Sequence, residues 1–199
     1  MSPGATFERV YEAIKEQLGS GRYGAGVHLE PAVLSEDLSA SITPVRDALH
    51  RLVGEGLVEA PRGDGFRTPI VTEVGLRHLY RWNAALLDAA TRSRHYRATA
   101  AECGAQGDED VLAFMERTFL RIGASSGNPE HLAAIAGLND RLRPIRRAEL
   151  KLLPGIQSEI DELVEKLAEG SVVQLRRPIA QFHRRRERAV ADIVASMLA

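Results

Sequence analysis

The sequence predicts a mostly α-helical protein with two domains, residues 1–69 and 70–199, and three observations support this prediction. Apolar residues recur at helical spacing through most of the chain. Glycine- and proline-containing segments interrupt this spacing and mark the turns between helices. A strand pattern is confined to residues 57–68, near the end of the first domain.

The composition is that of an ordinary globular protein: of 199 residues, 44% are apolar and 27% are charged, with a net charge of -1. No apolar run approaches the roughly 18 residues of a membrane-spanning helix. The N-terminal residues lack the pattern of a secretory signal. The single cysteine, Cys103, excludes an internal disulfide and a cysteine-rich zinc site. We therefore expect a cytoplasmic protein with no membrane segment.

The first domain is predicted to contain three short helices followed by a two-stranded hairpin with a glycine-rich tip. Pro31 and Pro44 fall in first helical turns, where a missing N–H group costs nothing. Ser41 or Thr43 can cap the third helix. The helices are expected at residues 7–18, 31–39 and 41–55, and the strands at 57–60 and 66–68. This order of elements describes a winged helix-turn-helix.

The second domain is predicted to contain helices alone. Asn128 followed by Pro129 is a sharp helix start. Pro178 predicts a kink or break inside the last helix, and we expect Trp82 and Phe119 in the core. The helices are expected near residues 72–92, 93–103, 108–125, 129–150, 155–169 and 171–197.

One motif gives the first domain a family resemblance. Residues 29–49 read LEPAVLSEDLSASITPVRDAL, and Glu55-Gly56-Leu57-Val58 follows at a fixed distance. This stretch resembles the DNA-binding signature of the GntR family, and the resemblance covers about residues 7–69. It implies a winged helix-turn-helix that binds double-stranded DNA and places its third helix in the major groove.

Side-chain chemistry assigns roles within this motif. Ser41 and Thr43 are short donors suited to phosphate oxygens, and Arg46, one turn further, can bind guanine O6 and N7 through both guanidinium nitrogens. Arg62 lies at the tip of the wing. The residues expected to contact DNA are Ser41, Thr43, Arg46, Arg51, Arg62 and Arg67.

Two observations argue against strong DNA binding. The motif departs from the family pattern at two positions, and the first domain has more acidic than basic residues. The family usually has arginine at the positions of Ile42 and Ala32. Residues 1–71 carry 7 Lys/Arg and 10 Asp/Glu residues, although DNA affinity rests largely on cations that neutralise phosphates. We expect DNA binding that is weaker or has a different sequence preference, with Arg46 as the main residue that recognises a base. The alternative is a winged helix that no longer binds specific DNA and serves protein contacts only.

The second domain resembles the FadR-like subdivision of the family through LYRWNAALLDAA (79–90), ERTFL (116–120) and ASSGNP (124–129). The resemblance implies a bundle of six or seven helices that forms a homodimer and binds a small-molecule effector. Many relatives hold a divalent metal there with one Asp and three His. The corresponding positions here are Glu116, Leu120, Ile160 and Phe182, with His183 adjacent. We expect no metal and no cofactor, because one carboxylate and one imidazole are too few ligands.

The effector is expected to be held by burial and a few polar groups. The candidate residues are Asn83, Glu116, Asn139, Arg143 and His183. The alternative for His183 is the surface, since it precedes three arginines. The basic residues Arg176 and Arg177 and the basic run at residues 184–188 are expected to face solvent or a dimer partner, with a second DNA face as the less favoured reading.

These inferences describe a homodimeric transcriptional regulator that binds a palindromic operator and responds to a small effector, such as an organic acid. An enzyme is not expected, because the sequence contains no nucleophile elbow, phosphate loop or zinc triad. The alternative within the family is a metal-dependent regulator that uses His78, His95 or His131.

Overall fold

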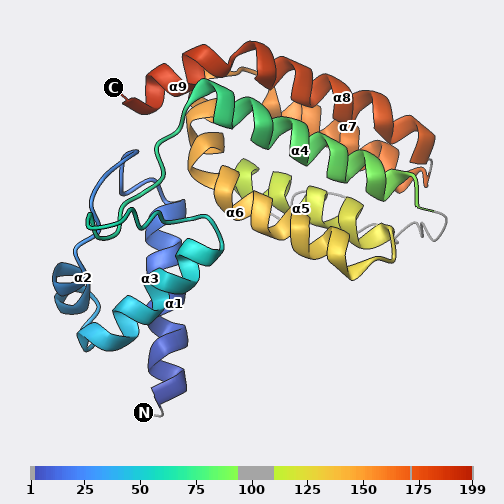
Figure 1. Ribbon diagram of the computed structural model, residues 1–199. Helices are drawn as coiled ribbons and strands as arrows, with labels where there is room; N and C mark the ends of the chain where they lie inside the picture. The colour runs from blue at the N-terminus through green and yellow to red at the C-terminus, as the bar shows by residue number, and fades with distance from the viewer. Residues whose placement is uncertain (1–2, 94–109, 171, 199) are drawn as a thin grey trace. The chain divides into compact units, whose positions relative to one another are not determined.

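The computed structural model describes residues 3–93, 110–170 and 172–198 (Figure 1). The chain divides into two compact units, Thr72–Ser196 and Met1–Val71 with Met197–Ala199. The predicted mostly α-helical fold is confirmed, with nine helices in the described residues. The helix expected at 93–103, with His95 and Cys103, lies outside the described residues from residue 94 onward. None of the described helices is both long and apolar enough to span a membrane.

The first unit contains α1 (Pro3–Gly19), α2 (Pro31–Asp37) and α3 (Ile42–Gly54), close to the predicted bounds. The apolar stripes of α1 and α3 face each other, and α2 packs on α3. The residues fully enclosed between them are Val10, Ile14, Val45, Ala48, Leu49 and Leu52, all 0% exposed. This core fixes which face of α3 remains available to solvent.

The predicted hairpin is reduced to a single bridge. Glu59 and Arg67 exchange two backbone hydrogen bonds of 2.8 and 2.9 Å, and no longer ladder forms around them in the described residues. The tip turns through Gly63 and Gly65, whose φ values of 79° and 68° are strained for side-chain-bearing residues.

A third segment, residues 27–29, was not predicted but belongs to the wing. The Leu29 N–H donates to the Phe66 carbonyl over 2.8 Å, and the Thr68 N–H donates to the Val27 carbonyl over 2.9 Å. Three residues are too few to show a two-residue period, so the sequence pattern gave no sign of this pairing.

The second unit is a helical bundle in which α4 runs beside α8, and α5 runs beside α6 (Figure 1). Asn128 caps α6 by accepting a 3.0 Å hydrogen bond from the Glu130 N–H, as predicted from its place before Pro129. The helices are α4 (Glu73–Thr91), α5 (Val111–Ser125), α6 (Pro129–Leu152), α7 (Ile156–Ala168), α8 (Val172–Arg188) and α9 (Val190–Leu198).

Two predictions for the second domain are wrong. The last helix does not break at Pro178, which lies buried inside α8; the break falls at Ala189, between α8 and α9. Trp82 is 53% exposed rather than part of the core, whereas Phe119 is 0% exposed as predicted. A proline removes one backbone hydrogen bond, and burial of its ring and neighbours can offset that loss.

Replacing glycine by alanine is expected to affect the stability of the bundle differently at two positions. A Cβ on Gly137 would meet nothing within 4 Å, so Gly137→Ala should stabilise the bundle by about 0.5–1 kcal/mol through higher helix propensity. A Cβ on Gly123 would lie 2.8 Å from Cδ1 of Ile135, which is itself 0% exposed. We expect Gly123→Ala to be less stable than Gly137→Ala by about 1–3 kcal/mol.

Urea unfolding followed by fluorescence measures this difference, because Trp82 is the only tryptophan of the chain and lies on α4. Equal stabilities for the two variants would show that Ile135 moves aside without cost.

Candidate functional site

The outer face of α3 is the candidate nucleic-acid interface. Val45, Leu49 and their neighbours fill the inner face, so the helical period turns Thr43 and Arg46 outward, and both are exposed. Ser41 occupies the N-cap position with extended backbone, but its side chain makes no capping hydrogen bond. The capping role predicted for that side chain is therefore not seen.

Charge pairing separates the arginines of the first unit into two groups. Arg22 pairs with Asp37 at 3.1 Å, Arg51 and Arg67 pair with glutamates, and Arg9 donates to a backbone carbonyl. Within residues 3–71, by contrast, no side chain or carbonyl forms an ion pair or hydrogen bond with Arg46 or Arg62. Both unpaired arginines are exposed, one on α3 and one at the wing tip. Although this unit has more acidic than basic residues, none of its described carboxylates neutralises these two guanidinium groups.

Arg51 and Arg67, also predicted to contact DNA, are placed in internal ion pairs. Arg51 lies 3.9 Å from the ring centre of Tyr11 and pairs with Glu8 at 3.3 Å. Arg67 pairs with Glu59 at 3.0 Å across the wing bridge. These contacts occupy both guanidinium groups, one between α1 and α3 and one within the wing.

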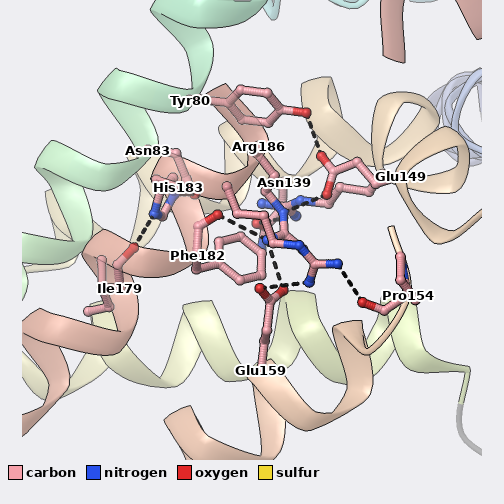
Figure 2. A network of polar contacts seen from close by, with 12 residues as sticks. Tyr80, Asn83, Asn139, Glu149, Pro154, Glu159, Ile179, Phe182, His183 and Arg186 are labelled. Atoms are coloured by element: carbon pink, nitrogen blue, oxygen red, sulfur yellow. Dashed lines mark hydrogen bonds and ion pairs between the residues drawn. The ribbon is translucent and has the colours of Figure 1, made fainter. Parts of the chain in front are cut away.

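A second polar site lies inside the helical bundle (Figure 2). Its centre is an ion pair between Arg186 on α8 and Glu149 on α6, with a 2.7 Å Nε–Oε2 distance and side-chain exposures of 1% and 0%. The other Glu149 oxygen accepts a 2.6 Å hydrogen bond from the Tyr80 hydroxyl. Arg186 Nη1 also reaches Glu159 at 2.9 Å. The carboxylate and guanidinium are thus held by partners from two other helices of the bundle, α4 and α7.

A neighbouring group joins α5 to α6. Arg146, which is 1% exposed, donates to Asn139 Oδ1 over 2.9 Å. The Asn139 amide donates to the Glu116 backbone carbonyl over 3.2 Å, and Arg143 pairs with the Glu116 carboxylate at 3.0 Å. Burial raises the pKa of Glu116, while the guanidinium groups of Arg143 and Arg146 oppose this shift.

His183 and Asn83 complete the network from α8 and α4. His183 Nδ1 lies 2.7 Å from the Ile179 carbonyl, and Nε2 lies 2.9 Å from the Asn83 carboxamide. Burial lowers the pKa of His183 to about 3, against the effect of the Ile179 hydrogen bond, so the ring is neutral near pH 7. A neutral ring that donates through Nδ1 must accept at Nε2, which requires the NH₂ group of Asn83 there. In either carboxamide orientation, one atom of Asn83 has no partner among the described residues.

The five predicted effector residues therefore fall into two groups of the same network: His183 with Asn83, and Glu116 with Asn139 and Arg143. The surface alternative for His183 is wrong, because the side chain is 2% exposed. The expectation that residues 184–188 all face solvent or a partner is wrong for Arg186, which is 0% exposed.

The most buried members of the network, Arg146, Glu149 and Arg186, were not among the predicted site residues. A signal existed: the buried positions Ile135, Leu142 and Ile145 of α6 continue at helical spacing onto Arg146 and Glu149. Charged residues within an apolar stripe are buried only when they have partners, and those partners lie on other helices.

Three of the four metal positions implied by the resemblance, Leu120, Ile160 and Phe182, carry apolar side chains that pack in or against the bundle core. Ile160 is 0% exposed and Phe182 is 3% exposed, and both belong to the bundle core. In the described parts of the chain, no three His, Cys, Asp or Glu side chains are grouped to hold a metal ion. His95 lies outside these parts.

The buried imidazole predicts loss of stability in mild acid. The pKa of His183 is about 3 in the folded chain and near 6.5 when unfolded, so below pH 6.5 the unfolded state binds a proton that the folded state excludes. Stability contributed by the neutral ring is therefore full above pH 6.5 and falls by up to about 1.4 kcal/mol per pH unit toward pH 3. Urea unfolding between pH 6.5 and pH 5, followed through Trp82, measures the slope.

His183→Gln is the matched variant, since glutamine keeps hydrogen-bonding groups but does not titrate. Its stability should change much less over the same interval. An equal slope in both proteins would assign the acid sensitivity to other groups.

Comparison with known proteins agrees with this geometry. Residues 6–67 match the model of the family described as bacterial regulatory proteins, gntR family. The Nta operon transcriptional regulator of Aminobacter aminovorans is 28% identical over 137 residues, which span 62% of this chain and 65% of that protein. The matched relatives are regulators rather than enzymes.

Two solved structures share the fold. McbR/YncC of E. coli superposes with a TM-score of 0.68 at 22% identity, covering 94% of this chain and 97% of that chain. A transcriptional regulator GntR from Rhodococcus sp. RHA1 gives a TM-score of 0.74 at 13% identity, covering 96% and 98%. A winged helix followed by a helical bundle is thus common to all three chains. Residues 6–67 thus match the gntR family of bacterial regulatory proteins, and the whole chain shares its fold with these two solved structures.

Proposed function

We propose that the protein is a DNA-binding transcriptional regulator whose first unit contacts the operator through α3 and the wing. The observation that carries this proposal is the position of the two unpaired arginines: Arg46 on the outer face of α3 and Arg62 at the wing tip. In a unit with more acidic than basic residues, a DNA face requires cations that internal carboxylates leave free. Ser41 and Thr43, exposed beside Arg46, supply hydroxyl donors for phosphate oxygens.

We further propose that the protein acts as a homodimer on a palindromic operator in the cytoplasm. Two free arginines per winged domain give few phosphate contacts, so a single copy would bind DNA weakly. Two copies related by a twofold axis double these contacts and match the symmetry of two half-sites.

A direct test measures fluorescence anisotropy of the full chain with promoter-region duplexes at several salt concentrations. Each phosphate contact contributes to a linear fall of log K with log salt. We expect one salt-dependent complex with two chains per duplex. The absence of any salt-sensitive complex at low ionic strength would reject the proposal.

We propose that the helical bundle holds an anionic effector, such as an organic acid, at the network of Figure 2. Arg186 Nη2 and one atom of Asn83 are buried without a partner among the described residues, and such atoms fit the polar groups of a ligand. The residues bonded around Glu149, Glu159 and Asn139 also include three arginines (146, 185, 186) against those two glutamates, which favours an added negative charge. An effector that binds one dimer geometry more tightly would shift the spacing of the DNA-binding units.

The effector proposal predicts a ligand-dependent rise in stability. An organic acid present at 100 times its Kd should raise the free energy of unfolding by about 2.7 kcal/mol, which a thermal-shift screen detects. Asn83→Leu, which removes the carboxamide, should lose the shift while retaining the fold. A screen in which no acid stabilises the wild type, or in which this variant responds equally, would contradict this assignment.

A further inference from the structure

Ile42 is an exposed apolar residue on the candidate DNA face, and the pairing of the arginines gives it no role. It is the first residue of α3, lies between Ser41 and Thr43, and is 42% exposed, whereas Val45 and Leu49 of the same helix are 0% exposed. A single exposed apolar residue is ordinary on a protein surface. What distinguishes Ile42 is its location, one helical turn before the unpaired Arg46.

The helix geometry places the two side chains as neighbours. Residues four apart in an α-helix lie on adjacent turns with Cβ atoms about 5–6 Å apart, and their separation along the axis is about 6 Å. Base pairs are spaced about 3.4 Å apart along a duplex. A helix that presents Arg46 to one base therefore presents Ile42 within about two base pairs of it.

The chemistry of Ile42 limits what it can recognise. The side chain has no donor or acceptor, so the nitrogen and oxygen atoms on the base edges offer it nothing. The one apolar group displayed in the major groove is the C5-methyl of thymine. Phosphate contact is excluded for the same reason, because phosphate oxygens accept hydrogen bonds and attract cations.

We propose that Ile42 contacts the C5-methyl group of a thymine in the major groove, within about two base pairs of the base bound by Arg46, and so selects a T·A pair in each operator half-site. This assignment rests on the proposed DNA-binding function and adds a specificity-determining residue to it. Shielding one methyl group from water corresponds to roughly a fourfold gain in affinity.

The test begins with selection of binding sequences from a randomised duplex library by the full chain. Each thymine of the selected duplex is then replaced by uracil, which removes the methyl group and keeps O4. We expect one thymine in each half-site at which this replacement weakens binding about fourfold. Ile42→Ala should bind the thymine and uracil duplexes equally, and Ile42→Val should retain the preference. Circular dichroism melting checks that both variants fold.

A gain-of-function variant gives an independent result. Ile42→Arg should select guanine in place of that thymine and show a steeper salt dependence, because an arginine binds guanine O6 and N7 and adds a cation. The inference is overturned if no uracil replacement weakens wild-type binding, or if the penalty persists in Ile42→Ala. If the library yields no enriched duplex and no salt-dependent complex, the proposed DNA-binding function is rejected, and the thymine contact of Ile42 is rejected with it.

Discussion

Replacing Arg186 by methionine is expected to lower the free energy of unfolding of the helical unit by about 3–5 kcal/mol. The substitution leaves the Glu149 carboxylate, which is 0% exposed, without the guanidinium 2.7 Å from its Oε2 atom. The Tyr80 hydroxyl still donates to the other oxygen, and Arg146 still attracts the carboxylate electrostatically. Neither replaces the direct ion pair with Arg186 at a fully buried carboxylate. Methionine keeps most of the side-chain volume against Phe182, so lost packing contributes little.

Arg185→Met is the matched control for this experiment. Arg185 is adjacent in sequence and pairs with Glu159 at 2.9 Å, but its side chain is 33% exposed. Ion pairs with this degree of exposure are worth about 0–1 kcal/mol, so the control should unfold near the wild-type urea concentration. The unfolding of both variants is followed through the fluorescence of Trp82 on α4.

A double variant separates the charge from the packing. Arg186→Met combined with Glu149→Leu removes both charges and fills the space with apolar groups, which should recover most of the lost stability. Tyr80 then lacks its acceptor, so recovery should fall short by about 1–3 kcal/mol. If the single variant is as stable as wild type, Glu149 is not held as a buried carboxylate, and the network description is wrong.

The elements that the sequence predicted well are those whose signals are local. In α3, Ser41 precedes the first turn, Pro44 lies within it, and the inner face repeats at helical spacing, so the predicted bounds differ from the observed ones by about one residue. The same local pattern decides which side chains of α3 face outward. The exposed positions of Thr43 and Arg46 therefore follow from the sequence alone.

The polar network depends on partners that are distant in the chain. Arg186 meets Glu149 across 37 residues, and Tyr80 meets the same carboxylate across 69 residues. A charged side chain is exposed by default, and it is buried only where the fold supplies a counter-charge. The wing departs from prediction for a related reason, since residues 27–29 pair with residues 66–68 through backbone groups that carry no sequence signal.

Replacing Arg46 by alanine is expected to remove most sequence discrimination from DNA binding. A guanidinium that binds guanine through both nitrogens contributes about 1–3 kcal/mol of discrimination, or roughly a 5- to 150-fold preference over other bases. No described residue within the first unit holds Arg46 in an ion pair or hydrogen bond, so its removal should cost no stability. Anisotropy titrations with the selected operator and with single-base variants measure the preference.

Two further variants separate base recognition from phosphate attraction. Arg62→Ala should weaken binding by a similar factor for all sequences and reduce the salt slope by about one unit, because a wing-tip contact to phosphate carries no base information. Arg22→Ala removes a cation already paired with Asp37 at 3.1 Å, so it should change neither the preference nor the slope. If Arg46→Ala instead behaves like Arg62→Ala, α3 does not read bases through this residue. A response to Arg22→Ala as large as that to Arg46→Ala would mean that overall charge, rather than the unpaired arginines, determines DNA binding.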